Sequence, residues 1–260
     1  MTSAATPIVP GRRSLGERIA RALVPAGLRA HAWNLVVRWD HPLITQAYLA
    51  VHPEFRSVRL TRATALVIDG HSRCANTYAV CAFEQANPGL RLTHHLHNPR
   101  VFRRAVRLGV PALVLVRRPE DVVASMLAFE PALSAGDILR TYRDFYTPLL
   151  PILDELVVAD FDEVVRDFGA VVRQLNARFG TAFRQYVKSA DAEAAVMAAV
   201  ETFGAAHYAA RDFENRVSRP SKLRTAPRSV DSWDDEDWAA LAHADQLYRE
   251  VLARRFRAAV

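Results

Sequence analysis

Residues 65–85 read Ala-Leu-Val-Ile-Asp-Gly-His-Ser-Arg-Cys-Ala-Asn-Thr-Tyr-Ala-Val-Cys-Ala-Phe-Glu-Gln. An apolar run typical of a buried strand is followed by a short polar turn and then by a segment that can form a helix. In such a turn, backbone N–H groups and the positive end of a helix meet at one point, where they can bind a phosphate or a sulfate. The side chains of Arg73, Asn76 and Thr77 can also donate hydrogen bonds to anionic oxygens. The stretch therefore predicts a strand, an anion-binding loop and a helix.

This loop lacks the pattern of the nucleotide triphosphatases. No Gly-x-x-x-x-Gly-Lys-Ser/Thr string occurs, and the only lysines of the chain are Lys188 and Lys222. A P-loop kinase or a related phosphotransferase stays open as an alternative. If the chain were such an enzyme, its loop would lack the lysine that binds phosphate and the Ser or Thr hydroxyl after that lysine that binds Mg²⁺.

The loop instead resembles the 5′-phosphosulfate loop of the sulfotransferases, in which a cation, Ser, Gly, Thr or Asn, Thr and an aromatic residue follow one another. Here the segment reads Arg73-Cys74-Ala75-Asn76-Thr77-Tyr78. It keeps the cation, the Asn-Thr pair and the aromatic residue, while Cys74 replaces the serine and Ala75 the glycine. An alanine is tolerated at that position only if its φ angle is negative.

A second segment, Pro111-Ala-Leu-Val-Leu-Val-Arg-Arg-Pro-Glu-Asp-Val-Val-Ala-Ser125, predicts a buried strand and a helix with proline in its first turn. It resembles the 3′-phosphate segment of the same family. Arg117 and Ser125 stand at the two positions that hold the 3′-phosphate of the donor nucleotide there. Arg117 also follows the carboxyl end of a strand, where open parallel sheets bind their ligands. The alternative is an ordinary surface loop.

Two further segments extend the resemblance over residues 65 to about 225. Residues 156–180 predict the strand and amphipathic helix that follow in the family, with an altered order of aromatic and acidic residues. Near the C-terminus, a basic segment stands where the family closes a loop on the 3′-phosphate. The residues assigned to that contact are Arg219, Ser221, Lys222 and Arg224. The alternative for this segment is a linker rich in Arg, Pro and Ser.

The candidate general base lies in Leu92-Thr-His-His-Leu-His-Asn-Pro99. The family carries a Thr-His-Leu element after its second core strand, and both His94 and His95 match half of it. If the strand continued through this segment, His95 and His97 would share one face and His94 would lie on the other. We favour His95, then His94, then His97, with His71 of the loop as a further candidate. Structural histidines, or a metal site from His95 and His97, are the alternatives.

The resemblance implies sulfuryl transfer from 3′-phosphoadenosine 5′-phosphosulfate to a hydroxyl or an amine of a small-molecule, glycan or lipid acceptor. A histidine would take the acceptor's proton, and Arg73 with the loop N–H groups would stabilise the leaving group. Tyr78 could stack on adenine. This scheme needs no metal and no nucleic-acid partner. A degenerate, non-catalytic nucleotide-binding protein of the same fold is the second alternative.

The chain has 260 residues, a formal net charge of +6 and two cysteines. The basic charge suits an anionic ligand, and the few cysteines favour a reducing, cytoplasmic compartment. We expect one domain over residues 1–260, with residues 1–60 as a helical extension. Within this extension we expect a short amphipathic helix, which either packs on the core or contacts a membrane surface. Its apolar face is formed by Leu15, Ile19, Leu23 and Val24, while Arg12, Arg13, Arg18 and Arg21 lie elsewhere.

Alternating apolar and amphipathic segments predict a three-layer, P-loop-like α/β fold, in which a central parallel sheet is flanked by helices. We expect strands at 65–69, about 90–94, 113–116 and 156–159. We expect helices at 77–85, 99–107, 121–127, 135–153, 162–179, 190–215 and 235–255.

Overall fold

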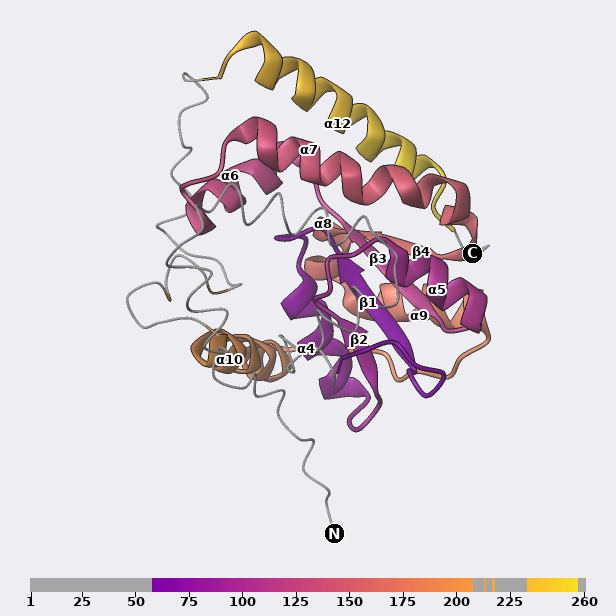
Figure 1. Ribbon diagram of the computed structural model, residues 1–260. Helices are drawn as coiled ribbons and strands as arrows, with labels where there is room; N and C mark the ends of the chain where they lie inside the picture. Colours follow the sequence, from indigo (N-terminus) through magenta and orange to yellow (C-terminus); the bar gives the residue numbers. More distant parts are fainter. Residues whose placement is uncertain (1–57, 208–212, 214–216, 218–232, 257–260) are drawn as a thin grey trace.

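The computed structural model describes residues 58–207, Phe213, Val217 and residues 233–256. Its sheet has four parallel strands in the order β2-β1-β3-β4, as Figure 1 shows. The strands are β1 (Leu66–Gly70), β2 (Leu92–His94), β3 (Ala112–Val116) and β4 (Val157–Asp160). Each differs by only one or two residues at its ends from the strand expected from the apolar runs. The expected α/β class with a central parallel sheet is confirmed.

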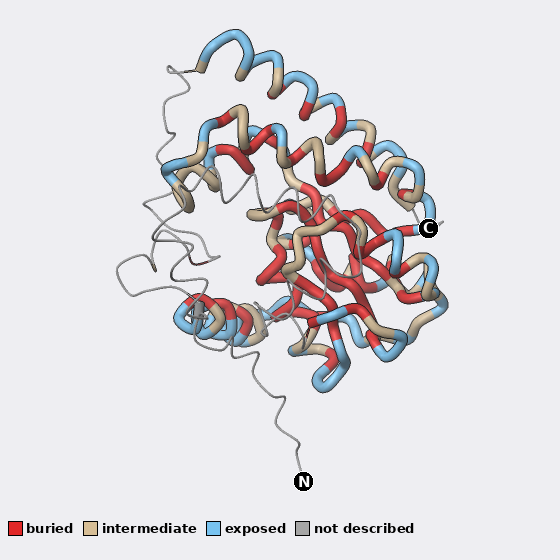
Figure 2. Tube along the Cα trace, in the orientation of Figure 1, coloured by how far each residue is buried: buried red, intermediate tan, exposed pale blue. Residues whose placement is uncertain are grey.

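Helices cover both faces of this sheet (Figure 1), which explains why its strands are continuous apolar runs. Every residue of β1 and β3 is buried, and Figure 2 shows this core at the centre of the molecule. The helices that follow β1, β2 and β3 are α4 (Asn76–Ala86), α5 (Arg100–Leu108), α6 (Pro119–Phe129) and α7 (Ala135–Tyr146). Those after β4 are α8 (Phe161–Arg166), α9 (Phe168–Phe179), α10 (Ala190–His207) and α12 (Asp235–Ala253).

Two expected helices differ from the structure. The helix expected over 135–153 ends at Tyr146 and continues as the 3-10 helix η2 (Thr147–Glu155), which contains Pro148 and Pro151. Proline removes a backbone donor and disfavours the regular α-helix there. The helix expected over 162–179 is interrupted at Asp167, whose φ of −149° is extended. The Asp167 side chain accepts a hydrogen bond from the N–H of Ala170 and so begins α9.

The order of the strands places a topological switch point at the carboxyl ends of β1 and β3, where open parallel sheets form their ligand-binding crevice. The chain leaves β1 for β2 on one side and then crosses to β3 on the other side of β1. At such a reversal, the connecting segments diverge to opposite faces of the sheet, and ligands bind between them. Residues 71–75 follow β1 and Arg117 follows β3, so both sequence motifs lie at this point.

Several sequence expectations lie outside the described residues. These are the helical extension apart from residues 58–60, most of residues 208–232, and with them the basic segment that holds Arg219, Ser221, Lys222 and Arg224. The helix expected over 190–215 is confirmed as far as His207. Among the described helices, none is long and apolar enough to cross a membrane.

Candidate functional site

The loop after β1 turns through two left-handed residues, Arg73 with φ 71° and Ala75 with φ 66°. Left-handed residues near right-handed ones let successive N–H groups converge on one side, which is the geometry of an anion-binding nest. In the described part of the chain, no acceptor bonds the N–H groups of Cys74, Ala75 or Asn76. With its positive φ, Ala75 occupies a conformation that suits glycine. The negative φ that an alanine at this position was expected to require is not found.

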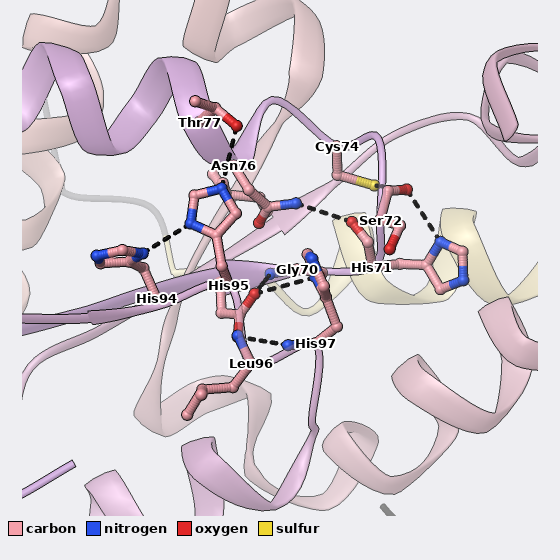
Figure 3. Close-up of polar contacts among 12 residues, drawn as sticks. Gly70, His71, Ser72, Cys74, Asn76, Thr77, His94, His95, Leu96 and His97 are labelled. Atoms are coloured by element: carbon pink, nitrogen blue, oxygen red, sulfur yellow. Dashed lines mark hydrogen bonds and ion pairs between the residues drawn. The ribbon is translucent and has the colours of Figure 1, made fainter. Parts of the chain in front are cut away.

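A network beneath the loop holds its shape. Asn76 Nδ2 donates to the carbonyl of His71 at 2.9 Å and closes the turn (Figure 3). The N–H of His71 donates to the Tyr146 hydroxyl at 3.3 Å, and that hydroxyl donates to the carbonyl of Leu115 in β3 at 2.7 Å. Helix α7 thus ties the loop to the neighbouring strand. The Oδ1 atom of Asn76 is buried and has no hydrogen-bond partner among the described residues.

Cys74 points its side chain into the protein rather than toward the crevice. It is completely buried, and its sulfur lies 3.5 Å from the Tyr146 hydroxyl. Burial raises the pKa of Cys74 to about 12. At this position of the loop, only the backbone N–H is available to a ligand.

The two motifs meet directly. Arg73 Nε donates to the Ser125 hydroxyl of α6 at 2.9 Å, and Arg117 Nη1 donates to the carbonyl of Arg73 at 3.2 Å. The Arg117 guanidinium also stacks on the Phe161 ring, with Cζ 4.0 Å from its centroid. Its Nε lies 3.9 Å from the Asp121 carboxylate. The guanidinium groups of Arg73 and Arg117 therefore link the loop after β1 to the segment that follows β3.

Tyr78 does not lie where the sequence suggested. Its ring is 4% exposed, and its hydroxyl donates to Glu193 of α10 at 2.8 Å. Burial and the hydrogen bond to Glu193 raise the pKa of Tyr78, so the hydroxyl stays protonated. The ring is covered by protein and leaves little face for a base to stack on.

The histidine segment does not continue the strand. Strand β2 ends at His94, and both His95 and His97 are left-handed, with φ 54° and 48°. The expected sharing of one strand face by His95 and His97 is therefore wrong. His95 bonds on both sides of its ring, with Nδ1 2.7 Å from His94 Nδ1 and Nε2 3.0 Å from Thr77 Oγ1 (Figure 3). The ring also stacks on Phe203.

His97 has a different environment. Its Nδ1 lies 2.8 Å from the carbonyl of Gly70 and 3.4 Å from Asp69 Oδ1. No described residue bonds its Nε2, and the side chain is 28% exposed. Burial lowers the pKa of His97, but the hydrogen bond and the charge of Asp69 outweigh this, so the net shift is upward.

His71 serves the fold rather than proton transfer. Its ring nitrogens lie 3.1 Å from the Ser72 carbonyl and 3.0 Å from Thr141 Oγ1. Burial and the nearby His97 lower the pKa of His71 to about 3, so the ring is neutral at pH 7. A group with so low a pKa is a weak base.

Sequence reasoning missed two residues that organise this site, Asp69 and Tyr146. Asp69 is an acid that ends an otherwise apolar buried strand, which was a readable signal. Nothing in the sequence marks Tyr146.

Among the described side chains, no group of three or more His, Cys, Asp or Glu could hold a metal ion.

No protein-family model, no curated protein and no solved structure matches this chain at a significant level. The resemblance to the sulfotransferases therefore rests on the sequence motifs alone.

Proposed function

We propose that the protein is a sulfotransferase. It would move a sulfuryl group from 3′-phosphoadenosine 5′-phosphosulfate to a hydroxyl or an amine of a small-molecule, glycan or lipid acceptor. The observation that carries this proposal is the meeting of the two motifs. Arg117 bonds the backbone of Arg73, and Arg73 bonds Ser125, at the crevice of the sheet. The P-loop-like character of the fold is part of the same proposal, since the loop follows the first strand of the sheet beside its switch point.

The loop would hold the 5′-phosphosulfate. The N–H groups of residues 74–76 and the positive end of α4 offer donors to the phosphate oxygens. Arg73 would stabilise the negative charge that grows on the bridging oxygen as the sulfur–oxygen bond breaks. Thr77, in the first turn of the same helix, adds a hydroxyl.

Arg117 and Ser125 would hold the 3′-phosphate. A guanidinium and a phosphate form paired, charge-assisted hydrogen bonds, which fix the nucleotide without joining the chemistry. In the structure these two side chains contact Asp121, Phe161 and Arg73. Nucleotide binding would exchange some of these contacts for phosphate oxygens. Adenine would have to stack elsewhere than on Tyr78, whose ring is covered.

Nucleotide binding measured by calorimetry tests the proposal. We expect 3′-phosphoadenosine 5′-phosphate to bind and ATP with Mg²⁺ not to bind. Binding of ATP with Mg²⁺ alone would favour the phosphotransferase alternative. Absence of binding by both nucleotides would overturn the proposal.

A non-catalytic nucleotide-binding protein of the same fold is the second candidate. The strained Ala75 and the inward Cys74 favour it, because both depart from the family's loop at the reacting phosphosulfate. Turnover separates the two candidates. Release of 3′-phosphoadenosine 5′-phosphate from the sulfated donor, followed with phenol and amine acceptors, would identify an enzyme.

We also propose a cytoplasmic location. Cys74 and Cys81 are both free and buried, and nothing in their placement calls for an oxidising compartment. Fractionation of cells that express the tagged chain would test this.

A further inference from the structure

Asp69 is the most heavily bonded carboxylate of the site. It is completely buried at the end of β1. One oxygen accepts from the N–H groups of Leu96 and His97, both at 2.9 Å, and the other accepts from the N–H of Gly70. Asp69 thus pins the histidine segment to the strand that carries the anion-binding loop.

The same carboxylate and the Gly70 carbonyl decide which nitrogen of His97 carries a proton. A carbonyl oxygen can only accept a hydrogen bond. Because Nδ1 lies 2.8 Å from that carbonyl and 3.4 Å from Asp69, Nδ1 must be the protonated nitrogen of the neutral ring. Nε2 then bears a lone pair, and no described residue occupies it.

His95, the histidine favoured by the sequence, lacks this freedom. Its two ring nitrogens already face His94 and Thr77. To accept a proton from a substrate, the ring of His95 would have to give up one of these bonds. His97 would have to give up none.

The backbone at His97 is also held in an unfavourable form. The left-handed conformation is unfavourable for a residue that carries a Cβ atom. His97 adopts it with φ 48° while Asp69 holds its N–H group. Such strain persists where surrounding bonds impose it, and it collects at functional sites.

We propose that His97 is the general base of the site and that Asp69 is its positioning residue. This inference rests on the proposed sulfuryl transfer. His97 Nε2 takes the proton of the acceptor O–H or N–H while the acceptor's electron pair forms the new bond to sulfur. The bond from sulfur to the bridging oxygen breaks, and its electrons leave with 3′-phosphoadenosine 5′-phosphate. The imidazolium faces the Asp69 carboxylate until it releases the proton to water.

The charged groups around His97 define its pH dependence. Asp69 faces it from β1, His71 and Arg73 from the loop, and His95 from its own segment with ring centroids 6.0 Å apart. Burial and Arg73 lower the pKa of His97, whereas Asp69 and the Gly70 carbonyl raise it, and the net shift is upward. A base must be unprotonated to act, so the acid limb of kcat/KM should lie at higher pH than an ordinary histidine would give.

Matched variants test the assignment with 2-naphthol and benzylamine as acceptors. We expect His97→Gln to lose about 10²–10⁴-fold in turnover and to keep its affinity for 3′-phosphoadenosine 5′-phosphate, because the base acts mainly in the transition state. The control His243→Gln, at an exposed position of α12, should stay within a few-fold of wild type. Asp69→Asn should move the acid limb to lower pH. Equal turnover for His97→Gln and wild type would overturn the proposal, while a wild type that binds no donor nucleotide would overturn the proposed function instead.

Nitrogen-15 NMR of the wild-type protein decides the matter without any acceptor. We expect His97 to be the Nδ1–H tautomer and to titrate at higher pH than an ordinary histidine. We also expect its resonances to shift when 3′-phosphoadenosine 5′-phosphate is added. An Nε2–H tautomer, or His97 resonances that do not shift when the nucleotide is added, would overturn the assignment of His97 and Asp69. This test holds even if Asp69→Asn fails to fold.

Discussion

Arg73 Nε donates a 2.9 Å hydrogen bond to the hydroxyl of Ser125, a residue 52 positions further along the chain. This bond joins the loop after β1 to helix α6. The Arg117 side chain adds a second link, to the carbonyl of Arg73. The two segments that resemble the phosphosulfate and 3′-phosphate elements of the sulfotransferases are therefore joined by direct hydrogen bonds.

Replacement of Arg117 should weaken the binding of a nucleotide that carries a 3′-phosphate and leave the binding of one without it almost unchanged. Each charge-assisted hydrogen bond contributes about 1.5–3 kcal/mol, so Arg117→Ala should weaken 3′-phosphoadenosine 5′-phosphate roughly tenfold or more. Adenosine 5′-phosphosulfate lacks the 3′-phosphate and should bind almost as before. The control is Arg118→Ala, since the neighbouring Arg118 side chain is 63% exposed. Equal losses for the two ligands in calorimetry would exclude Arg117 from the 3′-phosphate.

Ala75→Gly should stabilise the protein. The alanine has φ 66°, and glycine adopts this conformation without a steric penalty. Glycine also has greater conformational freedom in the unfolded chain, and this offsets part of the gain. We therefore expect a net increase of about 0.5–1 kcal/mol in the free energy of unfolding. Ala239→Gly, at an exposed position inside α12, should instead lose about 1 kcal/mol. Urea titrations measure both. A loss at position 75 would show that the loop does not need a left-handed residue there.

Acid should destabilise the protein through His71. Burial lowers the pKa of this residue from 6.5 to about 3. Between these values the unfolded chain binds a proton that the folded protein does not, so the free energy of unfolding falls as the pH falls. His71 alone should remove about 2–3 kcal/mol between pH 7.5 and pH 4.5.

Urea unfolding of His71→Asn across this pH range isolates that contribution. The variant should show a flatter pH dependence than wild type, whatever its stability at neutral pH. His243→Asn, on the exposed surface of α12, serves as the control and should keep the wild-type slope. Parallel slopes for wild type and His71→Asn would contradict the assignment.

Neither cysteine should react in the folded protein. Cys74 and Cys81 are the two cysteines of the chain, and burial raises the pKa of each to about 12. At pH 8 roughly one thiol in 10⁴ would be ionised, and the thiolate is the reactive form. We expect dithionitrobenzoate to titrate no thiol under native conditions and both thiols in guanidinium chloride. Rapid native reaction of either thiol, located by mass spectrometry, would contradict this prediction; if that thiol is Cys74, the loop opens.

The α/β class and the places of the four strands follow from the pattern of apolar residues along the chain. In short apolar runs such as residues 112–116, the side chains on both faces of the strand are buried only when helices cover both faces of a parallel sheet. The breaks at Asp167 and at η2 were harder to predict. They depend on a local cap and on two prolines that compete with an otherwise helical pattern.

The sequence also pointed to the two candidate anion-binding motifs, because the residue types that can bind phosphate are read directly from the chain. It could not establish that they meet. That depends on the strand order, which puts β3 beside β1 and leaves β2 on the other side.

Only the tertiary structure distinguished the histidines from one another. In the sequence, His94, His95 and His97 differ only in position. Their ring nitrogens differ because the partners come from elsewhere in the chain: Thr77 in α4 for His95, and Gly70 with Asp69 in β1 for His97. A proton's place on an imidazole is set by such hydrogen bonds, and residues distant in sequence become partners only when the chain has folded.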